Sequence, residues 1–212
     1  MAIQLYRDDQ PTVLPFSVDE ARDELELVGH AHDSKIIRKI HAATRIWERY
    51  TKRAAVPQTW VYVVESELAA QAGHVVSGGL VEGRAQTETA LACRPVLELP
   101  RPPVISVDKV ESREDIEDDY SETDAADFKI EADSAVDDIG RVIWLPGKTV
   151  PSFRRITFSC GYDGGELPPE CQETILKMVV HSFHNRGDME TKWPTALKSE
   201  LHGQIAGNVG VA

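Results

Sequence analysis

The sequence is short of cysteine, of basic residues and of long apolar runs, and each shortage excludes a class of protein. Its three cysteines, Cys93, Cys160 and Cys171, form no CxxC pair and leave one thiol over, which favours reduced thiols over a disulfide framework. No stretch approaches the roughly 20 apolar residues of a membrane span, and the opening Met1-Ala2-Ile3-Gln4 lacks the charged and apolar regions of a signal peptide. We therefore expect a soluble protein made in the cytoplasm.

The shortage of basic residues gives the chain a formal charge of −12, from 23 lysines and arginines against 35 acidic residues in a length of 212. Affinity for nucleic acid or for a membrane surface needs a basic face that neutralises anionic groups. Most of the imbalance lies in residues 108–138, which hold 14 acidic and 3 basic residues. Such a block is expected to lie outside the core, and the partners of the chain are expected to be proteins.

Two helices are predicted near the amino terminus. Ser17 and Glu20 have the spacing of a capping box, in which each side chain accepts a hydrogen bond from the other residue's backbone N–H, and this helix should end near Gly29. A second helix should run from Asp33 to about Thr51, with Asp33 or Ser34 as its N-cap. One face of this second helix is apolar and the other is basic. The basic face is expected either to be exposed to solvent or to contact acidic neighbours.

The middle of the chain has the period of strands, and the carboxy-terminal part returns to helix. In residues 153–160, Ile156, Phe158 and Cys160 alternate with polar side chains, as in a half-buried strand. Pro168 and Pro169 then precede a helix predicted to run from Glu170 to Asn185, because proline suits the first helical turn. A short last helix should follow Trp193-Pro194.

These elements predict an α+β fold. Two amino-terminal helices and a long carboxy-terminal helix would pack as a helical bundle, with an antiparallel β-rich region of five to seven strands inserted between them. We expect one composite domain with three parts: residues 1–56 in the bundle, 57–160 in the inserted region with its acidic loop, and 161–212 as the carboxy-terminal helices and tail.

Candidate chemistry is sparse, and no catalytic residue, cofactor site or metal site is predicted. His181 and His184 lie three residues apart on the predicted long helix, near Asp188 and Glu190, and this is the geometry that a metal site needs. They equally suit packing beside Phe183 or interaction with the negative end of the helix dipole. A small metal-dependent enzyme or regulator that uses the two histidines is the alternative to a structural protein.

Several stretches, taken in order, resemble the tailed-phage head–tail connector (adaptor) proteins, a group that includes adaptors of gene transfer agents. The matching stretches are 16–21 (FSVDEA), 47–51 (WERYT), 53–60 (RAAVPQTW), 99–104 (LPRPPV), 158–162 (FSCGY), 167–170 (LPPE) and 184–186 (HNR). Residues 66–90 and the long acidic block depart from the family pattern and look like enlarged insertions.

The resemblance implies a non-enzymatic role at the head–tail interface of a phage or a phage-like particle. Such proteins form a ring, usually of twelve copies, beneath the portal protein, and join it to a head-completion (stopper) or tail-terminator protein. DNA passes through the ring without tight binding. The resemblance implies a portal contact through the carboxy-terminal tail, with Leu201, Ile205, Val209 and Val211 as candidates. The acidic candidates Asp115, Glu117, Asp118 and Asp119 would line the channel or face a neighbouring basic ring.

Overall fold

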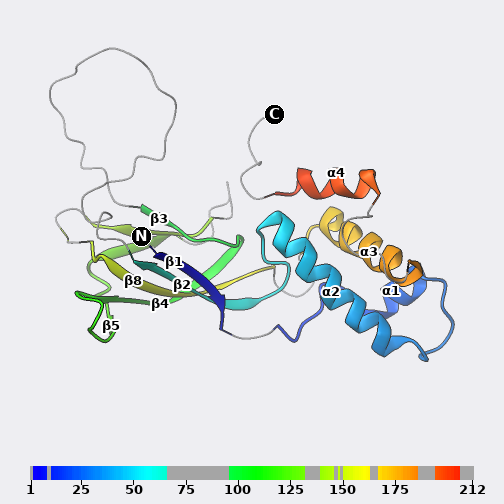
Figure 1. The fold of residues 1–212 in the computed structure, drawn as a ribbon, viewed down its shortest axis with the longest axis horizontal. Coiled ribbons are helices and arrows are strands. Elements are labelled where there is room, and N and C mark those ends of the chain that lie inside the picture. The colour runs from blue at the N-terminus through cyan, green and yellow to red at the C-terminus, as the bar shows by residue number, and fades with distance from the viewer. Residues whose placement is uncertain are drawn as a thin grey trace, which may run out of the picture. The chain divides into compact units, whose positions relative to one another are not determined.

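The structure is a computed structural model that describes residues 2–8, 11–65, 96–131, 139–145, 148, 150–162, 167–185 and 194–205 (Figure 1). The chain divides into two compact units. We call them the sheet unit, within residues 1–8, 59–99 and 104–159, and the helical unit, within residues 9–58, 100–103 and 160–212. Each unit is therefore assembled from segments that are distant in the sequence.

The strands of the sheet unit form two sheets. They are β1 (Ala2–Arg7), β2 (Gln58–Glu65), β3 (Val96–Glu98), β4 (Val104–Arg113), β5 (Ser121–Glu122), β6 (Phe128–Glu131), β7 (Arg141–Trp144) and β8 (Phe153–Cys160). The larger sheet has the order β1-β2-β8-β4-β5 and the smaller one the order β3-β7-β6. β1 pairs with β2 in antiparallel register, with Ile3 opposite Val64, and Phe128 of β6 lies opposite Trp144 of β7.

The core of the sheet unit follows the alternation of β8. Ile156 and Phe158 are buried, as the period of the sequence predicts, and so is Arg154, which shares their side of the strand. Cys160, at the end of β8 where the chain enters the helical unit, is buried too. The Arg154 guanidinium stacks over the ring of Trp144, 5.2 Å from its centroid, so a strand of each sheet contributes to this contact. Burial lowers the pKa of Arg154.

The helical unit contains α1 (Val18–Glu24), α2 (Asp33–Thr51), α3 (Pro169–His184) and α4 (Thr195–Gly203). In Figure 1, α2 and α3 run side by side, and α1 and α4 each contact both of them. Ile40, Trp47 and Val179 are fully buried in their shared core, and Phe183 packs against it while partly exposed. Among the described residues, no helix combines the length and apolar character needed to cross a membrane.

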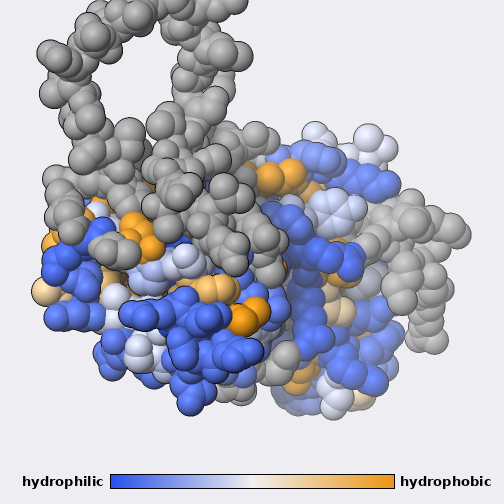
Figure 2. Space-filling view, turned by 60° about the vertical axis from the view of Figure 1, so that its left-hand side comes forward, coloured by the Kyte–Doolittle hydropathy of each residue, from blue (hydrophilic) through white to orange (hydrophobic). Residues whose placement is uncertain are grey.

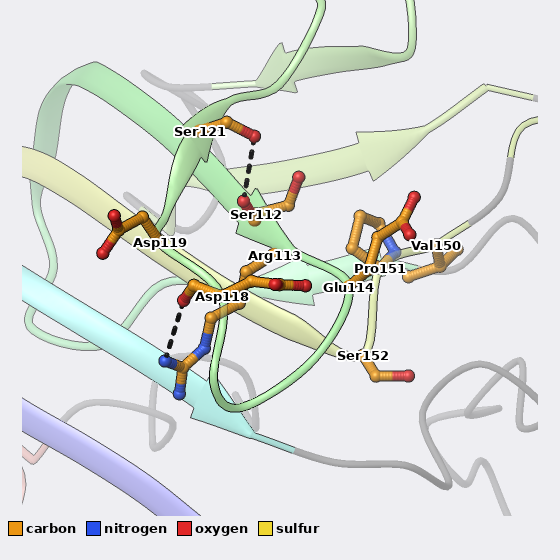
Figure 3. Close-up of a pocket in the computed structure, with 9 residues that line it drawn as sticks. All are labelled: Ser112, Arg113, Glu114, Asp118, Asp119, Ser121, Val150, Pro151 and Ser152. Carbon is orange, nitrogen blue, oxygen red and sulfur yellow. Dashed lines mark hydrogen bonds between the residues drawn. The ribbon is translucent and has the colours of Figure 1, made fainter.

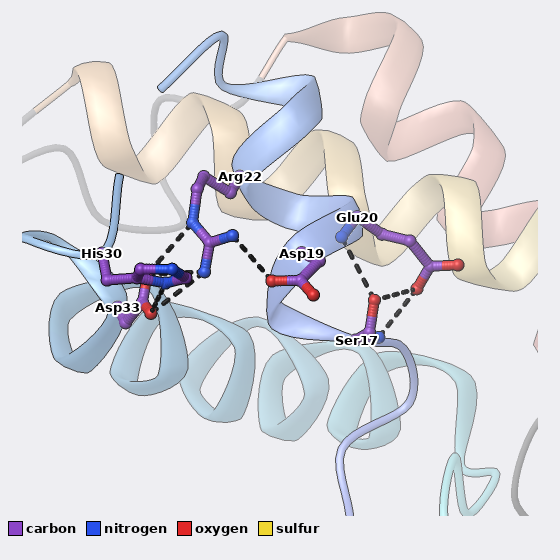
Figure 4. A network of polar contacts seen from close by, with 6 residues as sticks. All are labelled: Ser17, Asp19, Glu20, Arg22, His30 and Asp33. Carbon is purple, nitrogen blue, oxygen red and sulfur yellow. Dashed lines mark hydrogen bonds and ion pairs between the residues drawn. The ribbon is translucent and has the colours of Figure 1, made fainter. Parts of the chain in front are cut away.

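The capping box of α1 is confirmed, and a network of polar contacts extends from it (Figure 4). Ser17 N donates to Glu20 Oε2 at 2.7 Å, and Glu20 N donates to Ser17 Oγ at 3.1 Å. In the same network, Arg22 pairs with Asp33 at 2.9 Å and so links α1 to the start of α2. The predicted N-cap of α2 is wrong: His32 occupies that position without a side-chain bond, because the Asp33 carboxylate is taken up by Arg22 and His30.

The predicted fold class is wrong, although three of its helices start within one residue of where the sequence indicated. The predicted end of the first helix near Gly29 is also wrong: α1 ends at Glu24, and Glu26 already has a positive φ. The chain is not a helical bundle ending in a long helix, because the described residues contain four helices and eight strands arranged in two antiparallel sheets. The first element is the strand β1 rather than a helix, and the longest helix is α2, with 19 residues. The division into 1–56, 57–160 and 161–212 as one composite domain stays a prediction.

Candidate interaction site at the acidic turn

The turn between β4 and β5, which we call the acidic turn (residues 114–119), carries five acidic side chains among six residues. Its members are Glu114, Asp115, Ile116, Glu117, Asp118 and Asp119, and all six are exposed. The acidic candidates from the sequence, Asp115, Glu117, Asp118 and Asp119, therefore lie together on one solvent-facing loop. Figure 2 shows hydrophilic residues over most of the described surface on one face, with apolar patches that are small and separate.

The acidic turn is held by hydrogen bonds of its own. Asp115 N donates to Asp118 Oδ2 at 3.1 Å, Asp118 N donates to Asp115 O at 3.3 Å, and Ile116 N donates to Asp115 Oδ1 at 2.5 Å. Aspartate side chains commonly close turns in this way, by accepting from nearby backbone N–H groups. The carboxylates of Asp115 and Asp118 thus build the loop, while Glu114, Glu117 and Asp119 are exposed on it.

Arg113, the last residue of β4, anchors the turn to the sheet. Its Nη1 donates to the carbonyl of Ile116 at 2.8 Å, and its Nη2 pairs with Glu65 of β2 at 3.1 Å. The same guanidinium stacks over Tyr120, 4.6 Å from the ring centroid. Cation–π contacts of this kind contribute about 0.5–2 kcal/mol each, so the position of the turn is fixed by the sheet beneath it.

A second arginine also contacts Tyr120. Arg155 of β8 stacks over the same ring at 4.5 Å and makes a forked bond to Glu111 of β4, with Nε and Nη2 at 2.7 and 2.9 Å from its two oxygens. Glu111 is only 4% exposed and also pairs with Lys109 at 2.8 Å. The bonds from Arg155 are the main cause that lowers the pKa of Glu111 to about 2, against the cost of burial. Glu111 corrects the expectation that the acidic block lies wholly outside the core.

A cavity of about 620 Å³ opens beside the turn (Figure 3). Arg113, Asp118 and Asp119 line one part of it, and Val150, Pro151 and Ser152 line another. Carboxylates on its rim favour a cationic group over an anionic one. The exposed carboxylates thus give this surface a charge that suits contact with a basic partner.

The other predicted candidates have different surroundings. Leu201 is 0% exposed in the core of the helical unit, and Ile205 is half-buried just beyond α4. Gln204, between them, accepts a hydrogen bond from Trp47 Nε1 at 2.7 Å and donates to Thr174 at 3.0 Å, so this end of α4 is fixed to α2 and α3. Val209 and Val211 lie outside the described residues.

The histidine alternative has little local support. His181 Nδ1 lies 3.1 Å from the side-chain amide of Asn185, and the His184 ring makes an edge contact with Phe183. In the described ranges there is no group of three His, Cys, Asp or Glu residues placed to hold a metal ion. Asp188 and Glu190, the nearby carboxylates, lie outside those ranges.

Three of the stretches that carried the family resemblance meet within the helical unit, at what we call the strap: residues 53–58, 100–103 and 160–162. Ala54 N donates to Pro102 O at 3.0 Å, and Gly161 N donates to Pro103 O at 2.8 Å. The buried Glu48 carboxylate accepts from Ala55 N at 3.1 Å and from the Gln58 amide at 2.7 Å. The motifs are therefore a packing feature, since they satisfy buried backbone groups where the chain enters and leaves the helices.

The comparisons with known proteins concern the fold. The structure is similar to a chain in the neck of an empty gene transfer agent particle computed with C6 symmetry, at a TM-score of 0.66 and 17% identity over 99% of this chain and 97% of that one. It is equally similar to a chain in the neck of a native particle computed with C12 symmetry, with a TM-score of 0.66 and 19% identity over 99% of this chain and 97% of that one. A chain of the native gene transfer agent virion gives a TM-score of 0.66 and 17% identity over 98% of this chain and 97% of that one.

No protein-family model matches the sequence. No curated protein matches it either. At these identities the likeness to solved chains establishes a shared fold along nearly the whole length of both chains. The fold is therefore one that also occurs in chains from the neck and virion of gene transfer agent particles.

Sequence reasoning located the acidic turn but missed what holds it. Arg113, Tyr120, Arg155 and Glu111 come from two strands and a loop, and only the order of the strands in the sheet brings them together. The sequence contained one signal for this cluster: Arg113 and Arg155 each lie among polar residues of a strand. By itself, that position indicates only exposure to solvent.

Proposed function

We propose that this chain is a structural component of the neck of a phage-like particle of the gene transfer agent type. The observation that carries the proposal is the match of the fold over 99% of this chain and 97% of a neck chain. A match of this extent includes both units, so the chain corresponds to a whole neck subunit rather than to a widespread small domain. Its role is to connect other proteins and involves no chemical step.

Within the neck, we assign the chain to an adaptor ring beneath the portal protein. Two supports are independent of each other: the ordered family-like stretches, three of which meet at the strap, and the symmetric C6 and C12 assemblies from which the similar chains come. The ring, of twelve copies in this proposal, would join the portal to a stopper or tail-terminator protein and continue the DNA channel. A net charge of −12 suits a conduit that does not retain DNA.

The carboxy-terminal tail is our candidate for the portal contact. Leu201 is already packed in the core, so the contact rests on Ile205, Val209 and Val211, and Leu201 acts by anchoring α4. Apolar side chains on a tail that is too short to form a core gain buried surface when they dock on a partner.

The test is complementation of a strain that lacks the gene. Loss of the chain should give heads without tails, and the full chain should restore tailed particles with the protein located in the neck by electron microscopy. Deleting residues 207–212 should leave the urea midpoint of the purified chain unchanged and yet give tailless heads. Substituting Asn208 alone is the matched control. Normal tailed particles in the absence of the gene would refute the neck assignment, and normal particles with the truncated chain would refute only the tail contact.

A further inference from the structure

The larger sheet ends in two unlike edge strands, β5 and β1. β5 has only the two polar residues Ser121–Glu122, and a very short edge strand is a common way to keep a sheet from pairing with another chain. β1 has six residues in unbroken register with β2, contains no proline and carries its one charge at Arg7, its last residue. Ile3, near its start, is 51% exposed. Of these two edges, the chain therefore protects that of β5 and leaves that of β1 able to accept a further strand.

The hydrogen bonds of β1 show which of its backbone groups face outward. Asp8 N donates to Thr59 O at 3.0 Å, which continues the register of β1 and β2 by one step. Hydrogen-bonded and non-hydrogen-bonded pairs alternate along an antiparallel ladder. The N–H and C=O groups of Ile3 and Leu5 therefore point away from β2, and no other described strand pairs with that edge.

β6, an edge strand of the smaller sheet, has the same arrangement. Leu145 N donates to Asp127 O at 2.9 Å, which continues the register of β6 and β7 by one step. By the same alternation, Phe128 and Ile130 point their N–H and C=O groups away from β7. Ile130 is 38% exposed. The edges of β1 and β6 thus each present two apolar residues whose backbone groups face outward, two positions apart.

β6 matches β1 better than β3 does, at the other edge of the smaller sheet. β3 has three residues, and the bond from Leu99 N to Gly140 O at 2.8 Å leaves the charged Glu98 at one of its two outward positions. Charged side chains on an edge discourage pairing. β6 also follows β5 closely, on a connector turned by the bond from Asp127 N to Asp124 O at 2.9 Å. It is thus tethered beside β5, at the end of the larger sheet opposite to β1, and this placement suits a contact between chains.

We propose that β1 of one copy pairs with β6 of the next copy in the ring, as an antiparallel strand added to the edge of its smaller sheet. Ile3 then lies opposite Ile130, and Leu5 lies opposite Phe128. This is the one antiparallel register that uses all four outward residues. It sets apolar side chains opposite one another on the same face, which stabilises a strand pair.

The contact joins two different edges, so it is head-to-tail, and repeating it around an axis generates a ring. Pairing of β1 with a second β1 would instead give a closed twofold pair. The proposed ring of twelve copies needs a contact that repeats. This inference therefore rests on the proposed function.

A disulfide between neighbouring chains tests the register. Gln4 lies opposite Lys129 in the proposed pairing, at a non-hydrogen-bonded position where Cα atoms are about 4.5 Å apart, and disulfides join Cα atoms about 4.4–6.8 Å apart. Both side chains are exposed. In a Cys93→Ser background, Gln4→Cys with Lys129→Cys should give a ladder of linked chains on oxidation of assembled particles. Gln4→Cys with Glu122→Cys, on the exposed strand β5, is the matched control and should give no ladder.

A proline tests the backbone hydrogen bonds. Leu5→Pro removes the outward N–H and leaves the bonds of β1 to β2, because edge strands tolerate proline where the N–H faces solvent. Leu5→Ala loses the same side chain but keeps the N–H, so it is the matched control. The yield of tailed particles in the strain that lacks the gene should be at least about tenfold lower with Leu5→Pro than with Leu5→Ala, since the lost bond recurs at every contact of the ring. Equal urea midpoints of the two purified chains establish that both fold.

The outcomes separate the two proposals. No ladder in particles that contain the Gln4→Cys and Lys129→Cys chain, or equal yields from the two Leu5 variants, overturns the contact and leaves the neck assignment intact. Linked pairs from Gln4→Cys by itself would show that β1 pairs with β1, and would overturn it too. If Leu5→Pro lowers the urea midpoint, the disulfide ladder decides. Absence of the wild-type chain from the neck refutes the proposed function, however the variants behave.

Discussion

The sharpest test of the strap is Gly161→Ala. Gly161 has a φ of 118°, which is outside the conformations that residues with a side chain adopt readily. A Cβ atom built there would lie 2.1 Å from the carbonyl oxygen of Val56 and 2.4 Å from its carbon. These are backbone atoms, so no change of side-chain rotamer relieves the clash, and residues 53–58 and 160–162 must move apart.

The cost follows from what that movement breaks. Backbone strain of this kind costs about 1–3 kcal/mol. Separating the segments would also break the hydrogen bond from Gly161 N to Pro103 O. A buried N–H or carbonyl group left without a partner costs about 1–3 kcal/mol more. We expect Gly161→Ala to lower the free energy of unfolding by about 2–6 kcal/mol, a large part of the 5–15 kcal/mol typical of a domain.

Urea unfolding, followed by tryptophan fluorescence and by circular dichroism, measures this loss. Gly29→Ala is the matched control: Gly29 also has a positive φ, 78°, but nothing lies within 4 Å of its added Cβ. It should cost only the conformational penalty of about 1–2 kcal/mol. If the two variants lose the same stability, the close approach of Val56 is not a constraint and the description of the strap is wrong.

Four further predictions test the core, the sheet cluster, the buried thiols and the charge. Val179→Asp should abolish the cooperative thermal transition of the helical unit, because an unpaired buried carboxylate costs several kcal/mol; an unchanged Tm would contradict the packing. The pKa of Glu111 is about 2 in the folded state against 4.5 ordinarily, so its stabilisation of up to about 3 kcal/mol is present above pH 4.5 and is lost as the pH falls toward 2. Glu111→Gln should remove that part of the acid-unfolding curve, whereas Glu114→Gln at an exposed site should not. In a Cys93→Ser chain, Cys160 and Cys171 should resist alkylation at pH 8 until urea unfolds the protein, since both are buried and burial raises the pKa of Cys171 to about 11; rapid native labelling would refute this. Fluorescence anisotropy should detect no submicromolar, salt-sensitive binding of duplex DNA at physiological salt.

Features set by neighbouring residues could be predicted from the sequence. The capping box of Ser17 and Glu20, the helix Asp33–Thr51 and the alternating strand at residues 153–160 are confirmed, because their hydrogen bonds or periods involve residues a few positions apart. The proline-led start of α3 is confirmed for the same reason, within one residue. Composition showed an acidic block over residues 108–138 but not the turn at 114–119 within it.

Tertiary structure decided what depends on residues far apart in the chain. β1 is a strand because it pairs with β2 more than fifty residues later, and its own sequence carries no strong period. Glu111 is in a strongly acidic block and yet is buried, because Arg155 of β8 lies beside it and supplies two hydrogen bonds. Local sequence determined where the helices start and the charge of the turn, whereas strand pairing placed Arg155 beside Glu111 and Arg113 where it holds the turn.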